Sequence, residues 1–156
     1  MEETIKKTSI SGLVIIKRPT NEDDRGFFRE PVRIKEVEEA TGITFDVKQV
    51  NHARSSKNTL RGIHVAPWNK LIYVTRGKVQ AVIVDLRKDS GTYKKFESFI
   101  IGDENRSSIF VPAGVGNSYL VLSEDGKKLD FKVHAVERLV VDPSDLSYIG
   151  NGYKIQ

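Results

Sequence analysis

The chain has 156 residues, with 25 Lys or Arg against 21 Asp or Glu, which gives a net charge of +4 at neutral pH. The two signs are interspersed, a pattern as typical of a protein that binds a small anion as of one that binds nucleic acid. Aromatic residues do not alternate with basic ones, so we expect no nucleic acid partner. Because the sequence has no cysteine, disulfides, thiolate nucleophiles and cysteine-bound metals are excluded.

No apolar run in the sequence is long enough to cross a bilayer, and residues 1–7 lack the apolar core of a secretion signal. We therefore expect a soluble, cytoplasmic protein that has no membrane partner. The length fits one domain over residues 1–156, with residues 1–11 and 144–156 at its periphery.

The first third of the chain predicts short strands around a single helix. An apolar run predicts a strand at 13–16, and a polar turn at 21–26 leads into extended structure at 27–30. Apolar residues at helical spacing predict a helix over 34–41, which Gly42 ends. A strand is expected at 45–50, followed by a polar loop at 51–58.

The rest of the chain reads as strands at short, regular intervals. They are predicted at 71–75, 78–86, 93–101, 107–111, 117–122 and 129–141, and turn residues separate them. Many strands with one short helix indicate an all-β sandwich or barrel.

One segment gathers basic side chains beside strand-forming residues. Alternation along a regular strand would send Arg61 and His64 to opposite faces, so Gly62 between them is the expected place for a bulge or a close backbone approach. A short turn then brings Lys70 back at the start of the next strand, near His64. Two neighbouring cations would keep the imidazole neutral near pH 7, as a general base requires.

Five segments, in order along 12–142, resemble the dTDP-4-dehydrorhamnose 3,5-epimerase family, sugar-nucleotide enzymes with a cupin-type jelly roll. The family patterns are Asp/Glu-Arg-Gly-x-Phe-x-Glu, Gln-x-Asn-x-Ser, Leu-Arg-Gly-Leu-His, Lys-Leu-Val…Gly…Val-Asp-Leu-Arg…Ser-Pro-Thr-Phe and Ile-Pro-x-Gly-Phe. They match residues 24–30, 49–56, 60–64, 70–93 and 111–115 of this chain.

The resemblance implies a cupin-type double-stranded β-helix, a homodimer and a nucleotide-linked 4-keto-6-deoxyhexose as substrate. It makes His64 the base that removes the proton next to the C4 ketone, and Lys70 the cation that stabilises the enolate. The implied substrate-binding residues are Arg25, Glu30, Gln49, Asn51, Arg61, Asn117 and Glu137.

Three departures from the family pattern affect the chemistry. Asn117 stands where the family has a second histidine, and Phe131 stands where it has a tyrosine that returns a proton. Phenylalanine has no proton to give. The family's later Lys-Asp segment, whose Asp orients the histidine, is not matched. The proton would then come from water or from a tyrosine such as Tyr73 or Tyr119, and at most one of the C3 and C5 centres is expected to be inverted.

Cupins often bind a metal through His-x-His, a later Glu and a third His. His64 lacks the second histidine of that motif, and Asn117 replaces the third, so we expect neither a metal nor another cofactor. Three functions remain open: a monoepimerase, an epimerase with relocated groups, and a sugar-nucleotide-binding or regulatory cupin that has lost catalysis. A lone histidine is usually structural, and only the surrounding motif favours a catalytic His64.

Overall fold

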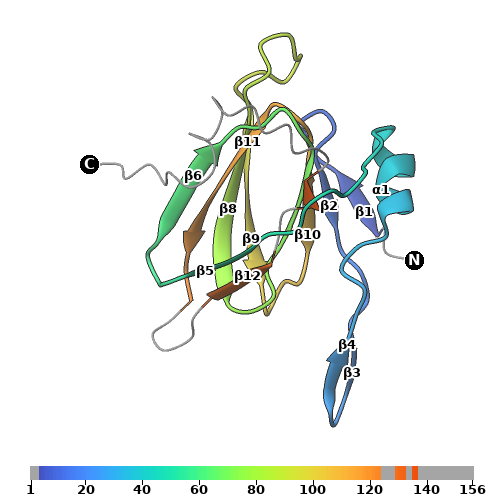
Figure 1. Cartoon of the computed structure of the whole chain (residues 1–156), viewed down its shortest axis with the longest axis vertical. Helices are drawn as coiled ribbons and strands as arrows, with labels where there is room; N and C mark the ends of the chain where they lie inside the picture. Colours follow the sequence, from blue (N-terminus) through green and yellow to red (C-terminus); the bar gives the residue numbers. More distant parts are fainter. Residues whose placement is uncertain (1–3, 124–128, 133–134, 137–156) are drawn as a thin grey trace.

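The computed structural model describes residues 4–123, 129–132 and 135–136. The described chain forms two face-to-face sheets (Figure 1), which confirms the expected all-β class. In the first sheet the strand order is β1 (Ile5–Lys7), β2 (Val14–Ile16), β10 (Ser108–Val111), β7 (Lys70–Tyr73) and β13 (Ala135–Val136). In the second sheet it is β6 (Leu60–His64), β11 (Val115–Val121), β8 (Lys78–Asp85) and β9 (Phe96–Gly102).

Period-2 alternation builds the main core between these sheets. Along β8 every second residue is buried, and the inward set is Val79, Ala81, Ile83 and Asp85. The facing residues of the first sheet include Ile72 and Ile109, which are paired across β7 and β10. Both sheets therefore contribute aliphatic side chains to one cluster.

A second cluster lies outside the first sheet, where helix α1 (Ile34–Thr41) covers it (Figure 1). Val37 of the helix is fully buried there, and the rings of Phe45 and Phe110 meet edge to face with centroids 5.2 Å apart. Gly42 ends the helix at φ 70°, as predicted, and its N–H donates to the Glu38 carbonyl.

Two predictions for the first third of the chain were wrong. Residues 45–48 form no strand, because Phe45 is drawn into the core beside α1 and its N–H donates to the Glu38 carboxylate. The predicted loop at 51–58 contains a strand instead, β5 (His52–Ser55), which pairs with β12 (Leu129–Lys132). The pairing partner is more than 70 residues away in the sequence, so no local pattern could predict this strand.

Of the turn predicted at 21–26, only residues 24–25 form a turn, at the tip of a hairpin, and 21–23 form a strand. Strands β3 (Asn21–Asp23) and β4 (Gly26–Phe28) pair with each other and extend away from the sandwich (Figure 1). The predicted strand at 93–101 begins only at β9, because residues 91–94 form a turn. The long strand expected at 129–141 appears as β12 and β13, and its remainder lies outside the described residues.

Candidate active site

A bulge in β6 brings Arg61 and His64 to the same face of the sheet. Antiparallel pairing joins His64 to Asn117 and Arg61 to Tyr119, so three steps along β6 match two steps along β11. Asn117 and Tyr119 both point inward from β11, and their paired residues lie on the same side. The distortion predicted between Arg61 and His64 is confirmed.

Gly62 permits this bulge because the two strands nearly touch there. A Cβ at position 62 would lie 2.5 Å from Ser118 Cβ and 2.7 Å from Ser118 Cα, and the backbone of Gly62 has φ 120°. Any side chain would collide with backbone and adopt a strained conformation. The close approach predicted at Gly62 is therefore confirmed.

Lys70 reaches across from the first sheet to the second. The side chain is 4% exposed, and its ammonium donates to Asn117 Oδ1 at 2.5 Å and to the His64 carbonyl at 3.2 Å. Burial lowers the pKa of Lys70 to about 8, because the charged form loses its hydration. At neutral pH the site therefore keeps a buried ammonium that gives up its proton more readily than an ordinary lysine.

His64 lies at the exposed end of this arrangement. Desolvation lowers its pKa below the ordinary value, and the positive charges of Lys70 and Arg61 lower it further. The imidazole is therefore neutral at pH 7, in agreement with the expectation drawn from its two neighbouring cations. A neutral imidazole beside a buried ammonium can take a proton from a carbon acid while the cation stabilises the resulting enolate oxygen.

A second polar chain runs along the same face. Arg61 Nε donates to Ser55 Oγ at 3.0 Å, and Ser55 Oγ lies 3.3 Å from the Tyr119 hydroxyl. Ser55 and Tyr119 are both buried. From the motif alone, Ser55 had no predicted role of its own. No local signal could have found it, because its partner Tyr119 lies 64 positions away in the sequence and is reached through a side-chain hydrogen bond.

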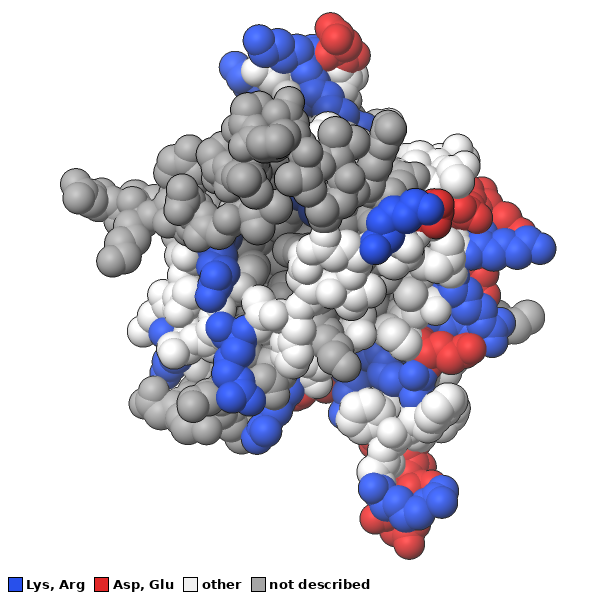
Figure 2. All heavy atoms as spheres, in the orientation of Figure 1, with Lys and Arg blue, Asp and Glu red and all other residues white. Residues whose placement is uncertain are grey.

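The other predicted binding residues that the structure describes lie in three separate regions. Gln49 donates to the Asn51 side chain at 2.5 Å, just before β5. Arg25 lies at the tip of the β3–β4 hairpin, with its side chain 85% exposed and paired with Asp23. Figure 2 shows both charge signs at that tip, well away from the sandwich.

Glu30 also lies apart from the cluster around His64. It forms ion pairs with Arg18 at 3.3 Å and with Arg33 at 2.7 Å, beside the start of α1. The last predicted binding residue, Glu137, lies outside the described part of the chain.

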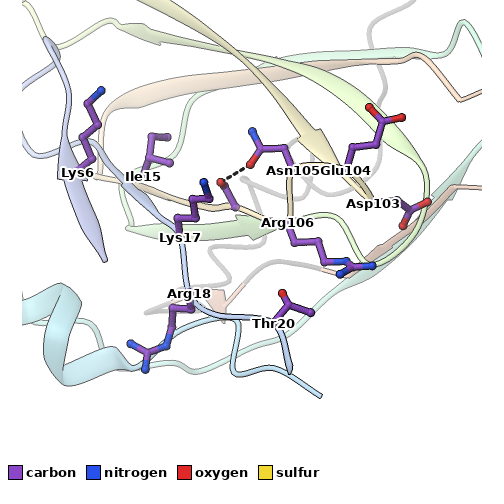
Figure 3. A pocket seen from close by; sticks show the side chains of 10 residues that line it. Lys6, Ile15, Lys17, Arg18, Thr20, Asp103, Glu104, Asn105 and Arg106 are labelled. Carbon is purple, nitrogen blue, oxygen red and sulfur yellow. Dashed lines mark hydrogen bonds between the residues drawn. The ribbon is translucent and has the colours of Figure 1, made fainter. Parts of the chain in front are cut away.

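The larger of two described cavities does not belong to this site. It measures about 520 Å³ and is lined by Lys6, Ile15, Lys17, Arg18, Thr20, Asp103, Glu104, Asn105, Arg106 and Ser107 (Figure 3). Arg18 points out of it toward α1, where it pairs with Glu36, and Arg106 pairs with Glu22. Carboxylates thus offset part of the positive lining, and none of the predicted site residues takes part.

Two further features bear on the class of chemistry. Within the described ranges, no group of three His, Cys, Asp or Glu side chains is placed to hold a metal ion. In the same part of the chain no helix has the length and apolar character needed to span a membrane.

Comparison with known proteins gives one consistent family. Residues 7–137 match the family described as dTDP-4-dehydrorhamnose 3,5-epimerase. The enzyme of that name from Methanothermobacter thermautotrophicus is 36% identical over 122 residues, which cover 76% of this chain. The same match covers 65% of the archaeal protein, so the chain spans about two thirds of that relative.

Solved structures agree with the sequence matches. The epimerase from Legionella pneumophila in complex with dTDP-4-keto-L-rhamnose is 35% identical, with a TM-score of 0.77 over 86% of this chain and 71% of that one. A 3'-monoepimerase from Streptomyces bikiniensis in complex with dTDP-quinovose is 31% identical, with a TM-score of 0.72 over 81% of this chain and 65% of that one. The likeness to these cupin-type enzymes confirms the expected fold.

Proposed function

Because this chain belongs to the dTDP-4-dehydrorhamnose 3,5-epimerase family, we propose that it epimerises a nucleotide-linked 4-keto-6-deoxyhexose. The observation that carries the proposal is the placement of His64 beside the buried Lys70, whose ammonium donates to the His64 carbonyl. The proposed location is the cytoplasm, and the proposed role is in deoxysugar and polysaccharide biosynthesis.

In the proposed reaction, His64 removes a proton from the carbon next to the C4 ketone. The electron pair moves to the ketone oxygen, and the ammonium of Lys70 stabilises the negative charge that develops there. A proton returned to the opposite face inverts the carbon. A ketone makes this proton acidic enough for a neutral imidazole, so no metal or organic cofactor is needed.

The diphosphate and base are assigned to the polar residues around this centre. Arg61 suits a phosphate because its guanidinium donates two charge-assisted hydrogen bonds. Asn117 has an amide that both donates and accepts, and suits a sugar hydroxyl. The remaining proposed contacts are Arg25, Glu30, Gln49, Asn51 and Glu137.

A homodimer would explain the position of the first of these residues. The β3–β4 hairpin projects away from the sandwich that holds the His64 cluster, so we place Arg25 at the substrate site of a second copy. Phe28 on the same hairpin is 73% exposed, and burying it against a second copy would stabilise the pair.

Two substitutions favour a rival function, a binding or regulatory protein that has lost catalysis. Asn117 and Phe131 replace the histidine and tyrosine of the family pattern. This rival predicts that dTDP raises the melting temperature. It also predicts that no keto sugar takes up solvent hydrogen.

Incubation with dTDP-4-keto-6-deoxyglucose in D₂O tests the proposal. The wild type should place deuterium at C3 or C5, and His64→Ala should slow this exchange at least about 100-fold. His52→Ala is the matched control, because His52 is exposed and lies outside the cluster. Stabilisation by dTDP without exchange in the wild type would establish the rival, and equal exchange in His64→Ala would remove His64 from the mechanism.

A further inference from the structure

We propose that Tyr119 is the general acid that returns the proton to the substrate carbon, in place of the tyrosine that position 131 lacks. The proposal rests on the proposed epimerase function and names a catalytic residue for it. It separates Tyr119 from Tyr73, the two tyrosines that the sequence left as alternatives.

The strand register puts Tyr119 on the same face as the proposed base. Tyr119 pairs with Arg61, and Asn117, two residues earlier on β11, pairs with His64. Two residues of a strand span about 7 Å, so the base and the acid are separated along the strand pair by about the width of a sugar ring. The side chain of Tyr119 is 8% exposed, so it belongs to the inner wall of the sandwich and not to its outer surface.

Tyr73 does not share a face with the proposed base. On β7, Lys70 and Ile72 face the interior, and alternation sends Tyr73 to the opposite face. There it lines a separate cavity of about 220 Å³ together with Phe27 and Arg29. None of His64, Lys70 and Asn117 lines that cavity, so Tyr73 lies apart from the ammonium that would hold the enolate.

The partners of the Tyr119 hydroxyl suit an acid that must become an anion for a moment. Ser55 Oγ lies 3.3 Å from it, and Arg61 Nε donates to the same serine oxygen at 3.0 Å. Because the serine oxygen accepts from Arg61, its own hydrogen is available to the tyrosine oxygen. After proton transfer, that hydrogen bond and the nearby guanidinium charge would stabilise the tyrosinate.

The contact between Ser55 and the Tyr119 hydroxyl also relates Tyr119 to the strand that carries position 131. Ser55 belongs to β5, and the pairing of β5 with β12 sets Phe131 opposite Ala53, two residues from Ser55. The Tyr119 hydroxyl thus reaches from β11 to the strand pair on which the family's tyrosine stands.

The proton balance of the step is complete. His64 accepts the α proton and becomes imidazolium, while the C–H electron pair becomes the enolate. The enolate carbon then takes the proton of the Tyr119 O–H on its other face, which restores the ketone and leaves a tyrosinate. Solvent reprotonates the tyrosinate and removes the proton from the imidazolium, so no oxidant or other co-reactant is required.

The test measures exchange and inversion separately in Tyr119→Phe, with dTDP-4-keto-6-deoxyglucose in D₂O. Inversion should fall at least about 100-fold, while hydrogen exchange through His64 and the KM change by less than about threefold. Tyr73→Phe should leave both rates unchanged. Adding Phe131→Tyr to Tyr119→Phe should restore part of the inversion, because it supplies a hydroxyl on β12.

Ser55→Ala gives a second measurement that does not alter the tyrosine. It should lower the ratio of inversion to exchange and leave the KM unchanged, whereas a purely structural role would lower both rates together. Inversion at the wild-type rate in Tyr119→Phe would overturn the proposal, as would a parallel loss of exchange and inversion in that variant. Absence of exchange in the wild type would instead show that the epimerase function itself has failed.

Discussion

The chemistry at residue scale depends on a charge difference between two neighbouring basic groups. His64 has a lowered pKa and is neutral at pH 7, while Lys70 has a pKa of about 8 and is still mostly protonated there. The proposed base and the proposed electrostatic stabiliser thus coexist within one hydrogen-bonded cluster. Loss of hydration is the main cause of both shifts, so the surrounding fold sets these properties.

The two pKa shifts predict a bell-shaped pH profile for kcat/KM. Activity should rise as His64 loses its proton below pH 6.5 and fall above about pH 8 as Lys70 loses its own. Initial rates of epimerisation between pH 5 and 9.5 check this. Lys70→Met should be slower and should lack the alkaline limb, so an unchanged limb in that variant would assign it to another group.

Lys70 also gives stability a defined pH dependence. The unfolded lysine keeps its proton to about pH 10.4, whereas the folded one releases it near pH 8. Between these values the unfolded chain binds more protons, so this group makes the free energy of unfolding rise with pH. The cost of burying the charged lysine is therefore greatest below pH 8.

At the scale of elements, the bulge in β6 and the end of β8 position the polar side chains. The bulge of β6 turns Arg61 and His64 to the face that Tyr119 and Asn117 share, each beside its cross-strand partner. At the end of β8 the buried carboxylate of Asp85 accepts hydrogen bonds from Arg87, Ser90 and Thr92, and so closes the turn before β9. Asp85 and Arg87 therefore form a structural ion pair at the end of this strand.

Gly62→Ala should destabilise the protein by on the order of 3 kcal/mol, because the new methyl group meets Ser118 and the backbone has a positive φ. It should also abolish activity by displacing His64. Gly91→Ala is the control, since nothing lies within 4 Å of a Cβ there and no positive φ is recorded. Urea denaturation compares the two, and equal midpoints would show that β6 tolerates a side chain at the bulge.

Asp85→Asn should lower the free energy of unfolding by on the order of 2 kcal/mol, because Arg87 loses its charged partner. The hydrogen bond from Arg87 holds the pKa of Asp85 well below its usual range. Its stabilisation is therefore full above about pH 4 and is lost as the pH falls below that value. Asp89→Asn, at an exposed carboxylate nearby, should leave the stability unchanged. Matching acid unfolding curves for Asp85→Asn and wild type would contradict the assignment to Asp85.

For the molecule as a whole, the β3–β4 hairpin is the feature that the sandwich does not account for. It projects away from both sheets and carries Arg25 at its tip and Phe28 in an exposed position (Figure 1). Covering such an exposed apolar projection with a second molecule is energetically favourable. The proposed homodimer gives the hairpin both a packing partner and a place beside a substrate.

Light scattering should therefore give twice the mass of one chain, and Phe28→Asp should halve that mass and weaken dTDP binding. Phe96→Asp is the matched control, since Phe96 on β9 is 70% exposed and Phe28 is 73% exposed. A monomeric wild type would end the dimer proposal. A dimeric Phe28→Asp with unchanged binding would remove the hairpin from the interface.

The sequence by itself determined the features that depend on neighbouring residues. Alternating apolar residues defined most strands, such as β8, and Gly42 marked the end of the helix. The spacing of Arg61, Gly62 and His64 required a distortion, and the short turn brought Lys70 back beside His64. Each of these follows from local backbone geometry and from the range of charge interactions over a few residues.

Only the tertiary structure decided which distant strands meet. It turned part of an expected loop into β5, placed Arg25 on a projecting hairpin, and joined Ser55 to Tyr119 across 64 positions. It also separated Tyr73 from Tyr119, which the sequence left equivalent. Pairing between remote strands is set by the burial of a whole core, and a one-residue change of register would reverse every side chain. For that reason the residue types indicated the candidate chemistry, whereas packing determined which residues share a face.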